Sequence, residues 1–103
     1  MTAERREVRA TSHVFEDLDR QLGLDRGPHG EPSRTDFQTF ELLEISDTFA
    51  NRFDELPQLI PGRPDYRVLI ATGKLVRAYT VIAPLAPDGV VELVALDIDA
   101  SAW

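Results

Sequence analysis

The sequence contains no cysteine, comparatively few basic residues and no long apolar run, and each shortage excludes a class of protein. Without cysteine, the chain cannot form disulfides, thiolate zinc sites or a cysteine nucleophile. Every apolar run is interrupted by Lys, Arg, Asp or Pro well before the ~18 residues of a membrane span, so we expect no transmembrane segment. The opening stretch, MTAERRE, lacks the apolar core of a signal peptide. A cytoplasmic location is therefore the expectation.

Acidic residues outnumber basic ones by 18 to 11, which gives a net charge of −7. This balance disfavours non-specific nucleic-acid binding, because the neutralisation of phosphates requires clustered Lys and Arg. The charge is nevertheless segregated: residues 35–61 and 88–103 are strongly acidic, whereas 62–87 contains four bases against Asp65 alone. These four bases are Arg63, Arg67, Lys74 and Arg77. At 103 residues the chain is expected to form one domain, 1–103, with one locally positive region.

Two helices are predicted in the first half of the chain, after a short candidate strand at residues 6–10. The first begins at Thr11-Ser12 and ends at Gly23, and a loop rich in Gly and Pro follows over residues 23–33. The second begins near Thr35, where Thr35 and Gln38 match a capping box, and ends before Pro57. Its apolar side, which is expected to supply most of the core, consists of Phe37, Phe40, Leu42, Ile45, Phe49, Phe53 and Leu56.

The second half of the chain alternates with a period of two and predicts antiparallel strands. Thr72-Gly73 fits a two-residue hairpin turn, which would place Tyr66 opposite Tyr79. A pair of opposite charges, Arg77 and Asp97, sets the register that we expect for the next strand. The face toward the helices would then consist of Leu69, Ala71, Val76, Ala78, Thr80, Ile82, Val94, Leu96 and Ile98. The other face would consist of Tyr66, Val68, Ile70, Leu75, Arg77, Tyr79, Val81, Asp97 and Asp99.

The predicted fold class is α+β, with two helices packed on one face of a mainly antiparallel sheet of about four strands, in the order β-α-α-β-β-β. The second face of this sheet mixes aliphatic, aromatic and charged groups. Exposed patches of this kind usually mark a binding surface. The alternative is that the long loop, the N-terminus or Trp103 folds over this face.

The order of elements resembles that of RelE/ParE-type toxins from bacterial toxin–antitoxin pairs. The resemblance is carried by SHVFEDLDRQLG, FANRFDELPQLIPGR, YRVLI, Gly73 with LVRAYTV, and DGVVELVAL. It implies a toxin that acts on translation, by mRNA cleavage, or on gyrase, together with a cognate antitoxin that wraps the domain. Members that cleave RNA tend to carry His, Arg, Lys or Tyr near the last strand, whereas this chain ends in LDIDASAW. A non-catalytic protein-interaction module with the same fold therefore stays open as the alternative.

The resemblance implies Arg77 and Tyr79 as candidate catalytic residues, since an Arg shortly before a Tyr is common on the third strand of this family. A guanidinium can hold a phosphate while a tyrosine stacks on a base. The structural alternative is that Arg77 pairs with Asp97 and that the tyrosines pack on each other. The candidate residues for binding a partner or a nucleic acid are Tyr66, Arg67, Val68, Ile70 and Leu75. In the predicted register Arg67 faces the helices, which suggests a salt bridge to Glu44 or Asp47.

The remaining polar groups favour structural roles. Glu92 lies on the opposite face from Asp97 and Asp99, so the three acids are interpreted as solvated rather than as a metal site. His13 is placed near Asp17 at the start of a helix and His29 in a loop, and no pattern marks either as catalytic. We therefore expect no metal and no cofactor. The oligomeric state stays open, a homodimer included.

Overall fold

The computed structural model describes residues 5–28 and 30–99, so the expectations for His29 and Trp103 lie outside the described residues. The fold is α+β. The strands are β1 (Val8–Ala10), β2 (Tyr66–Ala71), β3 (Ala78–Pro84), β4 (Val91–Leu93) and β5 (Ala95–Asp99). The helical elements are α1 (Ser12–Gln21), α2 (Arg34–Phe37), the π-helical turn η1 (Gln38–Leu42), α3 (Leu43–Arg52) and the 3-10 turn η2 (Phe53–Glu55).

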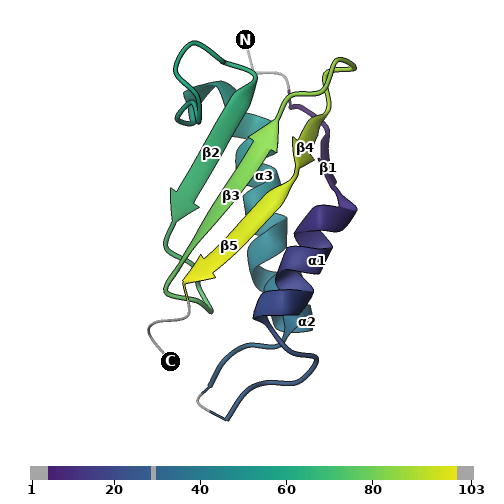
Figure 1. Cartoon of the computed structure of the whole chain (residues 1–103), viewed down its shortest axis with the longest axis vertical. Coiled ribbons are helices and arrows are strands. Elements are labelled where there is room, and N and C mark those ends of the chain that lie inside the picture. The colour runs from purple at the N-terminus through teal and green to yellow at the C-terminus, as the bar shows by residue number, and fades with distance from the viewer. Residues whose placement is uncertain (1–4, 29, 100–103) are drawn as a thin grey trace.

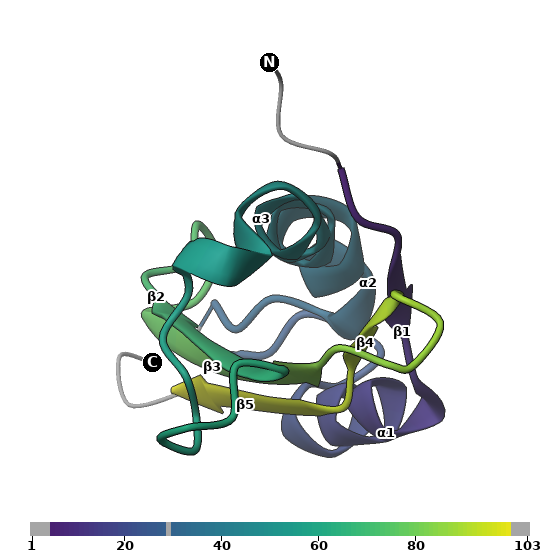
Figure 2. The same cartoon turned by 90° about the horizontal axis from the view of Figure 1, so that it is seen from above.

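The described strands form two small sheets rather than the single antiparallel sheet of about four strands that the sequence predicted. β2, β3 and β5 are antiparallel in that order, and β1 pairs with β4 in parallel. β4 and β5 follow one another with only Val94 between them, and the Val94 amide still donates to the Ile82 carbonyl at 3.0 Å. In Figures 1 and 2, α3 crosses one face of the β2–β3–β5 sheet while α1 lies beside β5.

The predicted hairpin register is wrong. Tyr66 lies opposite Pro84, and Ala71 opposite Tyr79, so the connection is the six-residue loop 72–77 rather than a turn at Thr72-Gly73. This shift by an odd number of residues inverts the faces of β3, because side chains alternate along a strand. Three β3 side chains, Tyr79, Val81 and Ala83, are consequently buried in the core.

The faces of β2 and β5 agree better with the prediction, because neither depends on the length of the loop. Leu69 packs against the core, whereas Ile70 is exposed. Leu96 and Ile98 of β5 are buried in the same core. The predicted pairing of Arg77 with Asp97 is wrong, however, since Asp97 lies opposite Thr80 and Arg77 precedes β3.

The N-cap of the second helical segment lies two residues earlier than predicted, and the segment contains a wide turn. The Ser33 side chain accepts from the Asp36 amide at 3.1 Å, and the Asp36 carboxylate accepts from the Ser33 amide at 3.0 Å, so Ser33 is the N-cap rather than Thr35. In η1 the expected core residue Phe40 is 51% exposed, whereas Glu41 is buried. Glu41 continues a stripe of every fourth residue, Phe37, Glu41, Ile45 and Phe49, which faces the sheet.

Candidate partner-binding edge

The two outer edges of the sheets differ in how completely other segments of the chain cover them. This difference defines the candidate site. Along one edge, the parallel pairing of β1 covers β4 from Val91 to Leu93. The chain then passes through Thr11, whose amide and hydroxyl both donate to the Leu93 carbonyl, at 3.1 and 2.8 Å, into α1. One continuous segment, β1 followed by α1, thus runs along the whole β4–β5 edge.

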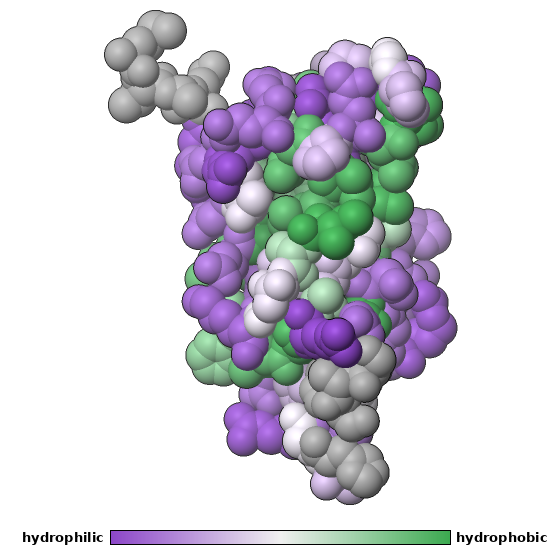
Figure 3. All heavy atoms as spheres, turned by 90° about the vertical axis from the view of Figure 1, so that its left-hand side faces the viewer, coloured by the Kyte–Doolittle hydropathy of each residue, from purple (hydrophilic) through white to green (hydrophobic). Residues whose placement is uncertain are grey.

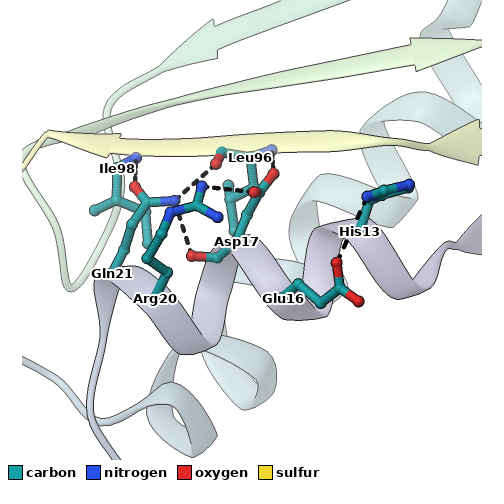
Figure 4. Close-up of polar contacts among 7 residues, drawn as sticks. All are labelled: His13, Glu16, Asp17, Arg20, Gln21, Leu96 and Ile98. Carbon is teal, nitrogen blue, oxygen red and sulfur yellow. Dashed lines mark hydrogen bonds and ion pairs between the residues drawn. The ribbon is translucent and has the colours of Figure 1, made fainter.

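Side chains of α1 replace a neighbouring strand for β5, as Figure 4 shows. Asp17 accepts from the Leu96 amide at 3.0 Å. Gln21 accepts from the Ile98 amide at 2.6 Å and donates to the Leu96 carbonyl at 2.8 Å. Because Asp17 and Gln21 lie one helical turn apart, both point toward the strand. They satisfy edge groups that would otherwise be open to pairing with another chain.

The pKa of the Asp17 carboxyl agrees with its role as a charged hydrogen-bond acceptor at the edge of β5. Partial burial acts to raise its pKa, but the hydrogen bond from the Leu96 amide and the nearby Arg20 guanidinium outweigh burial and lower the pKa below the ordinary 3.8. Arg20 donates to the second carboxylate oxygen at 2.6 Å. His13 lies one helical turn before Asp17 on α1, as predicted, and its Nδ1 is 3.6 Å from a Glu16 carboxylate oxygen (Figure 4).

The opposite edge, formed by β2, is covered over its first half only. The Val68 amide donates to the Pro57 carbonyl at 3.0 Å, and the Leu59 amide donates to the Tyr66 carbonyl at 3.1 Å. In an antiparallel pair, alternate residues direct their backbone groups away from the partner, so those of Ile70 point outward as those of Val68 do. Within the described residues, no hydrogen bond reaches the Ile70 amide or carbonyl.

Apolar side chains surround this open stretch. Ile70 is 71% exposed, the largest value among the large hydrophobic residues that the structure describes. Leu59 and Ile60, in the segment that lies along the start of β2, are 40% and 46% exposed. Figure 3 views the molecule from the side on which β2 is the outermost strand, and it shows a hydrophobic area in the middle of that side with hydrophilic surface around it. We call the open stretch of β2 around Ile70 the β2 edge.

The other predicted binding residues lie around this edge in different environments. Tyr66 is half-buried, with the Arg63 guanidinium 5.1 Å from its ring centre, and Val68 is buried. Leu75 is half-buried in the loop 72–77. The structure therefore brings Tyr66, Val68 and Ile70 onto the outer face of one strand, and places Leu75 in the loop after it.

Arg67 faces inward, as expected, but its contacts differ from the predicted salt bridge to Glu44 or Asp47. Its guanidinium donates to three backbone carbonyls: Pro64 at 2.7 Å, Leu56 at 2.7 Å and Asp54 at 3.3 Å. It also lies 5.5 Å from the centre of the Phe53 ring. These carbonyls belong to the chain that leaves η2 and approaches β2, where no regular ladder is available to satisfy them. Arg67 thus joins the two ends of this connection.

Arg77 and Tyr79, the candidate catalytic pair, lie in contrasting environments. Arg77 is exposed in the loop 72–77, whereas Tyr79 is 6% exposed and packs edge-on against Phe37, with ring centres 6.3 Å apart. Burial, followed by the charges of Glu41 and Glu44, raises the pKa of the Tyr79 hydroxyl above 10. The tyrosine is therefore a protonated core residue at neutral pH, and its ring is not available for stacking on a base.

No other arrangement of side chains in residues 5–28 and 30–99 suggests a cofactor or a metal. These residues hold no group of three or more His, Asp or Glu placed to ligate an ion. Glu92 pairs with Arg9 at 3.1 Å, and Asp97 is exposed. A cavity of about 750 Å³ lies between the N-terminal segment, the end of α3 and the β3–β4 connection. Its arginines Arg5, Arg6 and Arg52 are each ion-paired to a nearby acid.

Comparison with known families, curated proteins and solved structures finds no match for this chain. Among the described residues, no helix is both long enough and apolar enough to cross a membrane.

Proposed function

We propose that this chain is a protein-binding domain, the toxin-like component of a bacterial toxin–antitoxin pair, whose antitoxin adds an extended segment to the β2 edge. The observation that carries the proposal is Ile70, which is 71% exposed in the middle of a strand and directs its backbone amide and carbonyl outward. An open, apolar strand edge is a template for pairing with another chain.

The closed edge on the other side supports this interpretation. Proteins usually blunt a free edge with charge, proline or a covering element. Here β1 and α1 together cover the β4–β5 edge, and the chain 57–59 covers the start of β2. Among the described residues the covering stops at Val68, and an isoleucine rather than a lysine or a proline occupies the next outward position. A partner strand is the occupant that would satisfy both the backbone groups and the apolar side chain.

Two candidate functions follow for the domain, and different observations favour each. Action on translation or gyrase is supported by the exposed Arg77 at the end of the loop 72–77. A non-catalytic interaction module is supported by the burial of Tyr79 and by the exposed acid Asp97 on the last strand. Both candidates use the same partner-binding edge.

Binding is tested by co-expressing the chain with the product of the adjacent reading frame and measuring co-purification. Ile70→Lys should abolish the complex, because a charge on the apolar strand opposes burial under a partner. Leu43→Lys is the matched control: Leu43 is 65% exposed and belongs to α3 rather than to β2, and its substitution should leave the complex intact. Equal co-purification of the wild type and Ile70→Lys would refute the β2 edge as the site.

Toxicity is tested separately, by inducing the chain alone and following growth. If the domain is a toxin that uses Arg77, the wild type should arrest growth and Arg77→Ala should not. Tyr79→Phe serves as a control that keeps the ring packed against Phe37. Absence of arrest, together with an intact complex, would assign the chain to the non-catalytic module.

A further inference from the structure

The uncovered part of the β2 edge is short and is bounded at both ends. Toward the start of the strand, the Val68 amide donates to the Pro57 carbonyl at 3.0 Å, so the chain before β2 already lies where a neighbouring strand would lie. Toward its end, β2 stops at Ala71 and the chain turns into loop 72–77. Figure 1 shows β2 as the outermost strand of its sheet. Within the described part of the chain, an added strand can therefore pair with residues 69–71 only.

A second copy of β2 fits these bounds. In an antiparallel pair with a two-fold axis at Ile70, each Ile70 amide donates to the Ile70 carbonyl of the other copy. This exchange satisfies both backbone groups that no described hydrogen bond reaches. Ala71 of each copy then lies opposite Leu69 of the other. At the next position each chain has left the strand for its loop, so it does not meet the Pro57 that covers Val68.

The side chains and the charge of this stretch also favour a second copy. Directly opposite residues of a ladder point to the same face, so the two Ile70 side chains, each 71% exposed in the isolated chain, would pack together and leave water. The chain has a net charge of −7, and like charges oppose the association of two copies. Residues 68–73, VLIATG, contain no charged side chain, so two acidic chains can meet here without placing like charges opposite each other.

The small area of this contact determines how strong the association can be. A ladder over residues 69–71 buries much less surface than the ~1,600 Å² of a stable protein–protein interface, and contacts below about 1,200 Å² are typical of transient pairs. We therefore expect a dissociation constant of roughly 10–500 μM. A partner with a longer contact would displace the second copy.

We infer that the chain forms a weak two-fold dimer through the β2 edge, with Ile70 on the axis and the two three-stranded sheets joined into one. This inference goes beyond the proposed function, because it concerns the isolated chain and requires no partner. If both hold, the partner and the second copy compete for Ile70, and the free chain protects its own apolar edge.

The absence of cysteine from the sequence allows a direct test of the axis. Across the two-fold, the Cα atoms of the two copies of residue 70 would be about 5.5 Å apart, within the ~4.4–6.8 Å that a disulfide spans. Ile70→Cys should therefore form a covalent dimer on mild oxidation. Thr72→Cys should not, because this exposed residue lies two positions off the axis, on opposite sides of it in the two copies. Leu43→Cys, on an equally exposed part of α3, is the control for random collisions.

Sedimentation and hydrogen exchange test the dimer without a new thiol. The wild type should be monomeric at about 5 μM and largely dimeric at about 1 mM. Ile70→Lys should stay monomeric over this range, whereas Leu43→Lys should behave as the wild type. Exchange of the Ile70 amide should slow several-fold as the concentration rises. The Val68 amide, which is bonded to Pro57 within the chain, should exchange at an unchanged rate.

The outcomes keep the dimer and the partner apart. A wild type that stays monomeric at about 1 mM would overturn the inference, as would a dimer that survives Ile70→Lys. Cross-linking of Ile70→Cys no faster than that of Leu43→Cys would also overturn it, and this measurement decides if Ile70→Lys fails to fold. None of these results affects the proposed function, which depends on co-purification with the partner. Conversely, a dimer that is lost in Ile70→Lys while the partner complex persists would support the inference and remove the partner from this edge.

Discussion

Replacement of Arg67 by alanine should be among the most destabilising single changes in this domain. Arg67 is 8% exposed, and its guanidinium donates to the carbonyls of Pro64 and Leu56 at 2.7 Å, with a longer contact to that of Asp54. Truncation leaves at least two carbonyls without a donor and removes the contact with the Phe53 ring. Hydrogen bonds to charged groups contribute ~1.5–3 kcal/mol each, and the two short ones are not fully additive.

We therefore expect Arg67→Ala to lower the free energy of unfolding by about 3–4 kcal/mol, a large part of the ~5–15 kcal/mol typical of such domains. In Arg67→Lys, which keeps the charge but not the planar fork, the loss should be about half as large. The measurement is urea unfolding followed by circular dichroism, with the slope compared between variants to confirm that the transition remains cooperative.

Arg63 provides a matched control for this experiment. It also lies over an aromatic ring, that of Tyr66, and makes two hydrogen bonds to Asp65, at 3.0 and 2.9 Å. Its side chain is 53% exposed, however, so water replaces these contacts in the variant. Arg63→Ala should therefore cost much less than Arg67→Ala. If Arg67→Ala costs no more than Arg63→Ala, the argument that buried carbonyls depend on Arg67 is wrong.

Three further perturbations test the edge, the loop and the pH dependence. Asp17→Ala should cost about 1–2 kcal/mol and should speed hydrogen exchange at the outward-facing amides of β5, measured by NMR, more than at those of β3. Gly73→Ala should destabilise the domain by about 1–3 kcal/mol in thermal unfolding, because its Cβ would clash with the Glu41 carboxylate. The pKa of Asp36 is lowered by the Arg26 guanidinium and then by the Ser33 amide, and that of Asp17 is also lowered. Carboxylates whose pKa is lowered in the folded state stabilise that state at pH values above their unfolded pKa. The urea midpoint should therefore be constant from about pH 5 to 7 and should decrease as the pH falls below about 4. This decrease should be less steep in Asp36→Asn.

The sequence allowed the class of fold and two of the strand faces to be predicted, because these depend on local periodicity. The alternation in β2 and β5 places Leu69, Leu96 and Ile98 correctly without knowledge of the loop between strands. The faces of β3 could not be predicted in this way, since they depend on whether the hairpin has two or six connecting residues. The six-residue loop is held by Glu41, whose carboxylate accepts from the Lys74 and Leu75 amides at 2.8 and 3.2 Å. Glu41 is distant in sequence, and an acidic side chain is typical of a solvated helix surface.

In the candidate site, too, the residues that depend on local periodicity could be predicted, whereas contacts between distant segments could not. Ile70 was a candidate because it follows the alternation of its own strand, and it is exposed there. The role of Asp17 and Gln21 as substitutes for a strand was not visible, since a helix acid and amide i, i+4 apart predict solvent contact as readily as an edge contact. The burial of Glu41 could have been predicted from its spacing, because Phe37, Glu41, Ile45 and Phe49 follow one another at every fourth position.

The two sheet edges also separate stability from function in this domain. The β4–β5 edge is closed by residues of the same chain, so substitutions there should act on folding. The β2 edge at Ile70 contributes little to the core, since the side chain is largely exposed and the backbone groups have no described partner. A residue of this kind can be changed to lysine with little loss of stability. If Ile70→Lys abolishes partner binding while leaving the unfolding midpoint unchanged, binding is the reason that this edge is open.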